Sequence, residues 1–325
     1  MSTRGDGAIV FFFALSACAS KAPTPRHVVE EEKLIFAPDS RALKDRSRLR
    51  EGGKSAQIEM RPPRKAPLVR VNIGGQPAFM LVDSGASAHV ITQDVAHRLE
   101  VASKASGVSF LDAAGRRQSA RTTDASQIAI EGWGKLTSGP LYVVPGDGGH
   151  MSTISGIAGL LSPQTLDPSH TIVFDLSREE IHTVDGDQAA DPFMFGPQDL
   201  GVTKACGNIY FLTAIIEGEP VRMLVDTGAD STLVYGRTAA GHRLRMKRTE
   251  HGGEIHAVSG PVAADLLASV RMRVGGLLQT RDMTIIEAPG DGCGGEGILG
   301  LDVLRNCTLV FGSNSPPRTL NVRCR

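Results

Sequence analysis

The 325-residue sequence has no excess of charge of either sign, because Lys plus Arg and Asp plus Glu each number 35. Without a basic excess nothing points to a nucleic-acid partner, and without an acidic excess nothing points to a disordered chain. Aromatic residues make up only 5% of the chain. No apolar run approaches the roughly 20 residues that span a bilayer, which excludes a protein with several membrane-spanning helices.

Glycine, by contrast, is abundant, with 37 residues in the chain. Short β-branched runs bounded by glycine, with little long 3.6-residue periodicity, favour a turn-rich all-β protein over a helical bundle. With 41% hydrophobic residues the chain can bury a substantial core. Its length fits about two domains.

The N-terminus carries an export signal. The apolar run at residues 8–15 has the length of a signal-peptide core and is too short to span a membrane. The following Ser-Ala-Cys completes Leu-Ser-Ala-Cys, which resembles the bacterial lipobox. The resemblance implies that Cys18 is lipidated, and that Ala19 directs the protein to the outer membrane, facing the periplasm. An ordinary cleaved signal peptide is the alternative.

The other cysteines fit an oxidising compartment. They are Cys206, Cys293, Cys307 and Cys324. An even number predicts two disulfides with three possible pairings, of which we expect Cys293–Cys307 and Cys206–Cys324. A zinc site is the competing interpretation, but the CxxC and histidine spacings of such sites are missing, so we expect no metal.

An internal repeat divides the chain. Residues 75–86 (GQPAFMLVDSGA) recur 143 positions later at 218–229 (GEPVRMLVDTGA). Residues 156–160 (GIAGL) recur at 297–301 (GILGL), and 171–174 (TIVF) recur at 308–311 (TLVF). Three blocks in one order at this long period indicate a duplicated domain, not a solenoid of short repeats.

This repeat predicts the domain plan. We expect a signal peptide at 1–17, a charged tether at 18–54, lobes at 55–186 and 203–325, and a linker at 187–202. A propeptide or a membrane-surface contact is the other interpretation of the tether. The patterns predict strands at 68–73, 78–82, 127–130, 141–144, 271–274 and 283–286, and one short helix per copy, at 93–99 and 237–242.

Both copies place an aspartate, Asp83 or Asp226, directly after a buried strand. The glycine two positions later allows a sharp turn and a close approach of another chain. If the two loops face each other about a pseudo-twofold axis, the carboxylates come within hydrogen-bonding reach and retain one proton between them. Such a pair supplies the base and the acid that drive water onto an amide carbonyl.

These loops and the Gly-Ile-x-Gly-Leu blocks resemble the pepsin/retropepsin superfamily of aspartic peptidases, in which such carboxylate pairs are known. The resemblance implies an all-β fold of two homologous barrel lobes with the active site between them. It implies that the catalytic residues are Asp83 and Asp226, that Ser84 and Thr227 lock the loops together, and that Gly85 and Gly228 permit their approach. It also implies a peptide or protein substrate, no cofactor, and a monomer containing an intramolecular pseudo-dimer.

Two further traits are retropepsin-like. Ala86 and Ala229 follow the catalytic glycines where pepsins usually have Ser, and without that hydroxyl the carboxylate pKa is expected to be higher. We therefore expect activity near mildly acidic or neutral pH. Residues 109–115 and 254–260 resemble the flaps that close over substrate. The candidate substrate contacts there are Asp112, Ala113, Gly115, Val258, Ser259 and Gly260.

Other functions have weaker support. Residues 290–295 match GxGxxG but precede no helix, and GxSxG is missing, so neither a dinucleotide site nor a serine hydrolase is favoured. The principal alternative is a non-catalytic peptide- or envelope-binding lipoprotein on the same fold. Another alternative keeps catalysis but pairs each lobe with a second chain.

Overall fold

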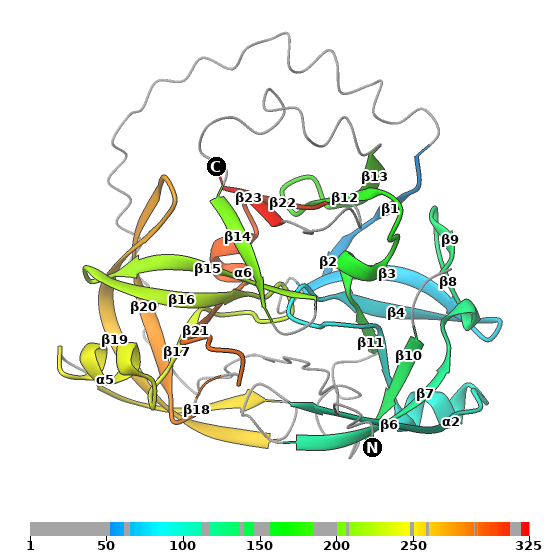
Figure 1. Ribbon diagram of the computed structural model, residues 1–325, viewed down its shortest axis with the longest axis horizontal. Coiled ribbons are helices and arrows are strands. Elements are labelled where there is room, and N and C mark those ends of the chain that lie inside the picture. Colours follow the sequence, from blue (N-terminus) through cyan, green and yellow to red (C-terminus); the bar gives the residue numbers. More distant parts are fainter. Residues whose placement is uncertain are drawn as a thin grey trace, which may run out of the picture.

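The expected all-β architecture of two lobes is confirmed. The computed structural model describes residues 53–61, 66–111, 117–136, 140–145, 157–184, 200–205, 208–247, 250–257, 260–288, 290, 292–312 and 320–324. Two lobes lie side by side, and the strands that connect them lie together at one end of both (Figure 1). We call the lobe built from β2 to β11 lobe N and the lobe built from β15 to β21 lobe C.

In lobe N the strands follow the order β6-β7-β10-β5-β11-β4-β3-β8-β9, and β2 pairs with β3. Their bounds are β2 Glu59–Arg61, β3 Ala66–Ile73, β4 Gln76–Val82, β5 Val90–Thr92, β6 Lys104–Leu111, β7 Arg117–Asp124, β8 Ile128–Ile130, β9 Gly134–Lys135, β10 Pro140–Val144 and β11 Ile157–Leu161. Helix α2 (Gln93–Arg98) begins at the side-chain cap of Thr92, and a 3-10 turn, η2, spans Ala125–Gln127.

In lobe C the order is β15-β16-β21-β17-β20-β19-β18. The bounds are β15 Ile209–Ile216, β16 Glu219–Val225, β17 Leu233–Tyr235, β18 Glu250–Ala257, β19 Gly260–Val274, β20 Leu277–Ile286 and β21 Gly297–Leu299. Two helices complete the lobe, α5 (Ala239–Arg245) and α6 (Leu301–Leu304). Strand for strand, β3, β4, β11, β5, β10, β7 and β6 of lobe N correspond to β15, β16, β21, β17, β20, β19 and β18, so the sequence repeat is a repeat of folds.

The repeated block forms the same hairpin in both lobes. Its two-residue turns have positive φ angles throughout, at Gly74 (59°) and Gly75 (92°) in lobe N and at Glu217 (50°) and Gly218 (84°) in lobe C. Turns of this kind match the right-handed twist of the strands that they join. The returning strands, β4 and β16, become fully buried over their last three residues. Each strand thus delivers the residue after it into the interior.

The predicted alignment of the two glycine blocks was wrong by three positions. It set Gly159 against Gly300, but β11 pairs Gly159 with Met80 and β21 pairs Gly297 with Met223, its equivalent in the repeat. A Cβ on Gly159 would lie 2.0 Å from the Val90 carbonyl, and one on Gly297 would lie 2.5 Å from the equivalent carbonyl of Leu233. Glycines three residues apart in both copies made the sequence alignment ambiguous.

Six strands join the lobes, in the order β1-β13-β12-β22-β23-β14, and β14 continues this joining sheet into lobe C by pairing with β15. Its strands are β1 Ser55–Gln57, β12 Thr171–Asp175, β13 Glu180–Val184, β14 Leu200–Ala205, β22 Cys307–Phe311 and β23 Leu320–Cys324. The central pair, β12 and β22, places Val173 opposite Val310. Strand β14 begins inside the range predicted as linker. At the end of the predicted tether, the Lys54 carbonyl accepts from the Thr183 N–H at 2.9 Å, and the Lys54 N–H donates to Thr183 Oγ1 at 2.8 Å.

The predicted disulfide pairing was wrong. Cys307 is bonded to Cys324 across neighbouring strands, with their Cα atoms 4.0 Å apart. The C-terminal strand β23 returns antiparallel to β22 and sets these two residues opposite each other, a topology that cysteine spacing does not reveal. Cys293 is also disulfide-bonded. Since Cys307 and Cys324 bind each other, neither predicted pair forms, and Cys206 lies outside the described residues.

Helices predicted at 93–99 and 237–242 are present as α2 and α5, while α6 was not predicted. All six predicted strands are present, with Gln127 ending η2 instead of starting β8. Within the described part of the chain, no helix is long and apolar enough to cross a membrane. The predicted signal peptide, Cys18 and the tether up to residue 52 lie outside the described residues.

Candidate active site

Asp83 and Asp226 occupy equivalent positions at the ends of two buried strands. The Asp83 N–H donates to the Leu161 carbonyl of β11 at 2.8 Å, and the Asp226 N–H donates to the Leu299 carbonyl of β21 at 3.1 Å. Each loop is therefore anchored on the parallel strand beside it. Both aspartates are 0% exposed.

Within each loop, backbone N–H groups hold one carboxylate oxygen. Gly85 and Ala86 donate to Asp83 Oδ1 at 2.8 and 3.1 Å, and Gly228 donates to Asp226 Oδ1 at 2.8 Å. The two Oδ2 atoms are buried, and no donor in the described part of the chain reaches either one. Each carboxylate therefore has one fixed oxygen and one oxygen open to a further partner.

Four hydrogen bonds lock the two loops across the lobe interface. The Ser84 N–H donates to Thr227 Oγ1 and the Thr227 N–H donates to Ser84 Oγ, both at 3.0 Å. Each hydroxyl then donates to the opposite strand, Ser84 Oγ to the Val225 carbonyl and Thr227 Oγ1 to the Val82 carbonyl, both at 2.8 Å. All four bonds are buried, so breaking one leaves an unsatisfied polar group in the interior.

The glycines lie directly against the opposite carboxylates. A Cβ built on Gly85 would lie 2.6 Å from Asp226 Cγ, and one built on Gly228 would lie 2.6 Å from Asp83 Cγ. Real Cβ atoms do not approach other atoms this closely, so only glycine fits at either position. The structure thus brings together all six residues predicted for the centre of the site.

Burial raises the proton affinity of both aspartates, and their contact divides it unequally between them. Burial raises the pKa of Asp83 well above its usual range, and the charge of Asp226 adds to this rise. Burial also raises the pKa of Asp226, to about 6, although the Asp83 carboxyl and, to a smaller extent, the Gly228 N–H partly counter this rise by stabilising the ionised form. The pair therefore retains a proton at pH values where an exposed carboxyl would have lost it.

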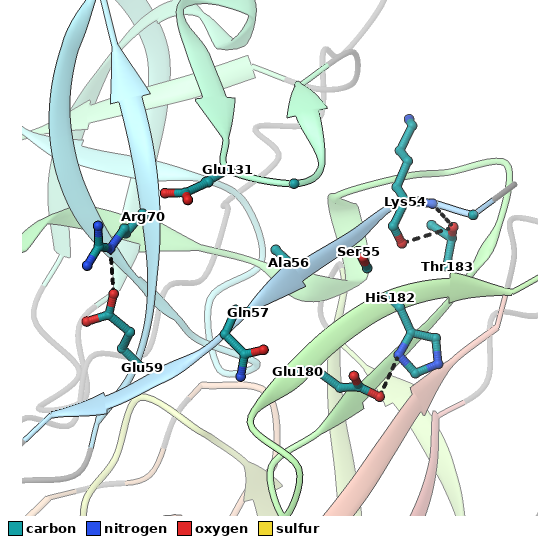
Figure 2. Close-up of a pocket in the computed structure, with 12 residues that line it drawn as sticks. Lys54, Ser55, Ala56, Gln57, Glu59, Arg70, Glu131, Glu180, His182 and Thr183 are labelled. Carbon is teal, nitrogen blue, oxygen red and sulfur yellow. Dashed lines mark hydrogen bonds and ion pairs between the residues drawn. The ribbon is translucent and has the colours of Figure 1, made fainter. Parts of the chain in front are cut away.

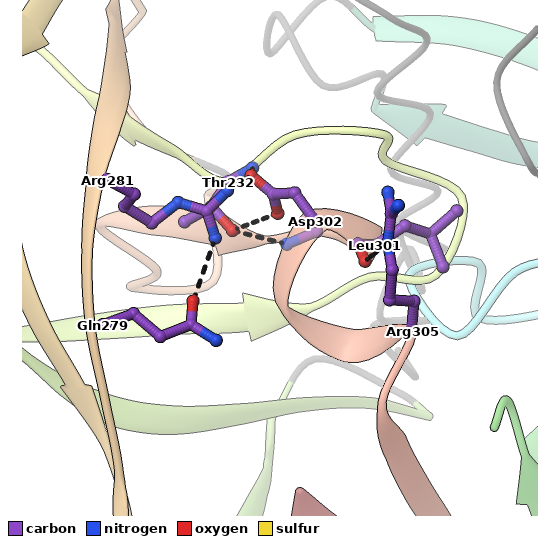
Figure 3. Close-up of polar contacts among 7 residues, drawn as sticks. Thr232, Gln279, Arg281, Leu301, Asp302 and Arg305 are labelled. Atoms are coloured by element: carbon purple, nitrogen blue, oxygen red, sulfur yellow. Dashed lines mark hydrogen bonds and ion pairs between the residues drawn. The ribbon is translucent and has the colours of Figure 1, made fainter. Parts of the chain in front are cut away.

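Behind the loop of lobe C stands helix α6. The Leu301 and Asp302 N–H groups donate to the carbonyls of Ala229 (2.7 Å) and Asp230 (3.2 Å). The Asp302 carboxylate accepts from Thr232, from N–H at 2.9 Å and from Oγ1 at 2.7 Å, and it pairs with Arg281. Figure 3 shows Arg281 reaching from β20 between Gln279 and Asp302.

Behind the loop of lobe N stands a 3-10 turn, η3 (Pro163–Thr165). Gln164 Nε2 donates to the carbonyls of Ser84 at 3.1 Å and Ala86 at 2.8 Å. The His89 ring accepts from the Ser162 N–H at 3.2 Å, and burial lowers its pKa to about 4. No sequence motif marks His89 or Gln164, so the sequence predicts a role for neither.

The predicted flaps are only partly described. Strands β6 and β7 pair as a hairpin, and so do β18 and β19, with Gly260 opposite Ala257. The other candidate contacts, Asp112, Ala113, Gly115, Val258 and Ser259, lie outside the described residues. Within the residues that the structure describes, no group of three or more His, Cys, Asp or Glu side chains could hold a metal ion.

A separate surface pocket of about 450 Å³ lies around β1 and contains neither Asp83 nor Asp226. Polar contacts lie along its wall (Figure 2). Glu59 accepts from Arg70 at 2.6 Å, and Glu180 lies 3.6 Å from the His182 ring. Lys54 and Glu131 also line the pocket.

Two family models match the chain, one in each lobe. Residues 69–161 match a family described as aspartyl protease, and residues 212–306 match one described as gag-polyprotein putative aspartyl protease. The first range contains Asp83 and the second contains Asp226. No curated protein matches the chain.

Two solved structures were also compared with the chain. The protease of EIAV, in complex with the inhibitor HBY-793, is 26% identical, with a TM-score of 0.23, covering 28% of this chain and 81% of its own. The aspartic proteinase from Irpex lacteus is 14% identical, with a TM-score of 0.49, covering 84% of this chain and 97% of its own.

Proposed function

Because the chain belongs to the retropepsin/pepsin-like superfamily of aspartic peptidases, we propose that it is an endopeptidase in which Asp83 and Asp226 form the catalytic dyad. The observation that carries the proposal is the face-to-face packing of the two loops, in which each glycine lies against the other loop's carboxylate. Both carboxylates come from one chain, so the site needs no second subunit.

In the proposed reaction the dyad holds one proton and binds a water molecule between its two Oδ2 atoms. The ionised carboxylate takes a proton from this water as the oxygen attacks the peptide carbonyl, while the protonated carboxyl donates to the carbonyl oxygen. The newly protonated carboxyl then donates to the amide nitrogen while the other carboxylate takes a proton from a gem-diol hydroxyl. The C–N bond cleaves to give a carboxylic acid and an amine, and the dyad again holds one proton. The backbone N–H groups on each Oδ1 keep the carboxylates oriented throughout.

The pH range of the reaction follows from the raised pKa values. A singly protonated dyad is required, because a fully protonated pair lacks the base and a fully ionised pair lacks the acid. Since burial raises the pKa of both aspartates, the singly protonated form persists to higher pH than it would in an exposed pair. We therefore expect cleavage from mildly acidic to neutral pH and its loss in alkaline solution.

Cleavage of a broad peptide library between pH 4 and 7.5 tests the function. We expect the wild type to cleave internal peptide bonds, and Asp83→Asn and Asp226→Asn each to abolish cleavage, because either change removes the acid–base pair. Thermal unfolding checks that the variants remain folded. A folded wild type that cleaves nothing but binds peptides would instead make the protein a binding lipoprotein on this fold.

We also propose that the protein is exported and anchored through a lipid on Cys18, on the periplasmic side of the outer membrane. The disulfide between Cys307 and Cys324 supports an oxidising compartment, where such bonds persist. Mass spectrometry of the mature N-terminus should show a diacylglycerol-modified Cys18, and Cys18→Ser should release the protein from membranes. An unmodified, soluble N-terminus would contradict the anchor.

A further inference from the structure

The two lobes support their catalytic loops from equivalent places but with different donors. The carbonyls of Leu161 and Leu299 accept from the N–H groups of Asp83 and Asp226, which makes these leucines equivalent. Counting on from them, Pro163 in η3 corresponds to Leu301 in α6, and the next residue, Gln164, corresponds to Asp302. Both helical turns therefore begin directly behind the loops.

In lobe C a backbone group holds the loop. The Leu301 N–H donates to the Ala229 carbonyl at 2.7 Å. The equivalent bond cannot form in lobe N, because Pro163 has no N–H. Without another donor, the Ala86 carbonyl would lack the hydrogen bond that the equivalent Ala229 carbonyl accepts.

Gln164 supplies the missing donor. Its Nε2 donates to the Ala86 carbonyl at 2.8 Å and also to the Ser84 carbonyl at 3.1 Å. The residue is 0% exposed, so water does not compete for these bonds. In lobe C the side chain of the equivalent residue, Asp302, is a carboxylate and cannot donate in this way. It accepts from Thr232 and pairs with Arg281 instead.

We propose that Gln164 is a positioning residue for Asp83, whose side-chain amide replaces the backbone donor that Pro163 removes. This inference rests on the proposed function. Ser84 and Ala86 flank Gly85, whose N–H donates to Asp83 Oδ1 and whose Cα lies against Asp226. The Gln164 amide therefore fixes the part of the loop that orients both carboxylates.

The test exchanges one kind of donor for the other. Gln164→Met keeps the length of the side chain and removes its N–H groups, and we expect kcat to fall roughly 10²-fold with little change in KM, as for a misplaced catalytic group. Adding Pro163→Leu restores a backbone N–H at the position that Leu301 occupies in lobe C. We expect this double variant to recover most of the lost kcat, and Pro163→Leu alone to resemble the wild type.

A pH profile separates positioning from a general loss of stability. The N–H groups of Gly85 and Ala86 lower the pKa of Asp83 by stabilising its ionised form. Burial and the charge of Asp226 raise the pKa of Asp83 well above its usual range, so Asp83 retains the shared proton and its titration sets the alkaline limb of the kcat profile. If Gln164→Met loosens these bonds, that pKa rises, and the alkaline limb moves to higher pH. The double variant should return the limb to its wild-type position, whereas a merely less stable enzyme would keep the limb in place.

Hydrogen exchange gives a readout that does not depend on catalysis. In folded Gln164→Met, amides 84–90 should exchange faster than in the wild type, while the equivalent amides 227–233 of lobe C serve as an internal control. Unchanged exchange in that variant would overturn the inference. So would a Gln164→Met kcat equal to that of an active wild type. Failure of Pro163→Leu to restore protection in the double variant would also overturn it. An inactive wild type would count against the proposed function alone, and exchange would still decide the role of Gln164.

Discussion

Lobe N and lobe C present the same Asp-(Ser/Thr)-Gly-Ala loop but support it with different chemistry. In lobe C the backbone of α6 and the Asp302–Thr232–Arg281 cluster stand behind the loop. In lobe N the side chains of Gln164 and His89 stand there. The features that agree are the glycine against the opposite carboxylate, the hydroxyl of the interlobe lock, and the backbone N–H donors to Oδ1. The chemistry therefore constrains the loop itself, while its support has only to supply donors at the right places.

The halves of the joining sheet differ in the same way. In the half from lobe C, β22 and β23 are tied by the Cys307–Cys324 disulfide. In the half from lobe N, β12 and β13 contain no cysteine, and Lys54 beside β1 instead pairs with the buried Asp167 at 2.9 Å. One half of the joining sheet is thus tied covalently between its strands, whereas in the other an ion pair ties the start of β1 to the segment before β12.

The glycines provide the sharpest test of what the lobes share. Gly85→Ala and Gly228→Ala should each reduce kcat/KM about 10³-fold, because the new methyl would displace the opposite carboxylate from its partner. Gly134→Ala is the control, since the φ of Gly134 (96°) is unfavourable for alanine, but no atom lies within 4 Å of its Cβ position. It should lose stability and keep its activity. An active Gly85→Ala enzyme would show that the loops do not pack as described.

The hydroxyls of Ser84 and Thr227 should contribute about equally to the free energy of unfolding. Thr227→Val and Ser84→Ala each remove two buried hydrogen bonds across the interface. We expect each to lower the free energy of unfolding by about 3 kcal/mol. Thr227→Ser and Ser84→Thr keep the hydroxyls and should cost less than about 1 kcal/mol. Urea unfolding measures these values, and a Thr227→Val protein as stable as the wild type would contradict the lock.

His89→Thr copies the lobe C residue Thr232 into lobe N and sharpens the comparison of supports. Burial lowers the pKa of His89 to about 4, against ~6.5 in an unfolded chain. The unfolded state therefore binds more protons than the folded state between these values, and wild-type stability falls as the pH drops through this window. From pH 7 to 4.5 the wild type should lose about 2 kcal/mol more than the variant. Equal losses in urea unfolding would show that His89 is not buried and neutral.

The candidate active site was predictable from sequence because its residues lie within the two short repeated blocks. Asp83 and Asp226 follow apolar strands in repeated blocks, and the positive-φ turns before those strands are set by neighbouring residues. The flanking helices α2 and α5 were predictable for the same reason. The face-to-face packing followed from the duplication once a pseudo-twofold axis was assumed.

The remaining features depend on contacts between distant segments. Cys324 meets Cys307 only because β23 returns beside β22. The two glycine blocks can be aligned correctly only when the pairing of β11 with β4 and of β21 with β16 is known. Gln164 acquires its role from the missing N–H of its neighbour Pro163 and from a loop about 80 residues away in sequence. No single-sequence pattern encodes such a contact.

Mixing two inactive variants tests most directly whether one chain holds the whole site. Asp83→Asn and Asp226→Asn are purified separately, confirmed as inactive, and then combined under conditions in which any dimers would exchange. With both carboxylates supplied by the same chain, the mixture should stay inactive at every ratio. Recovery of about a quarter of the wild-type activity would show that the dyad forms between chains, and would contradict a site assembled within one molecule.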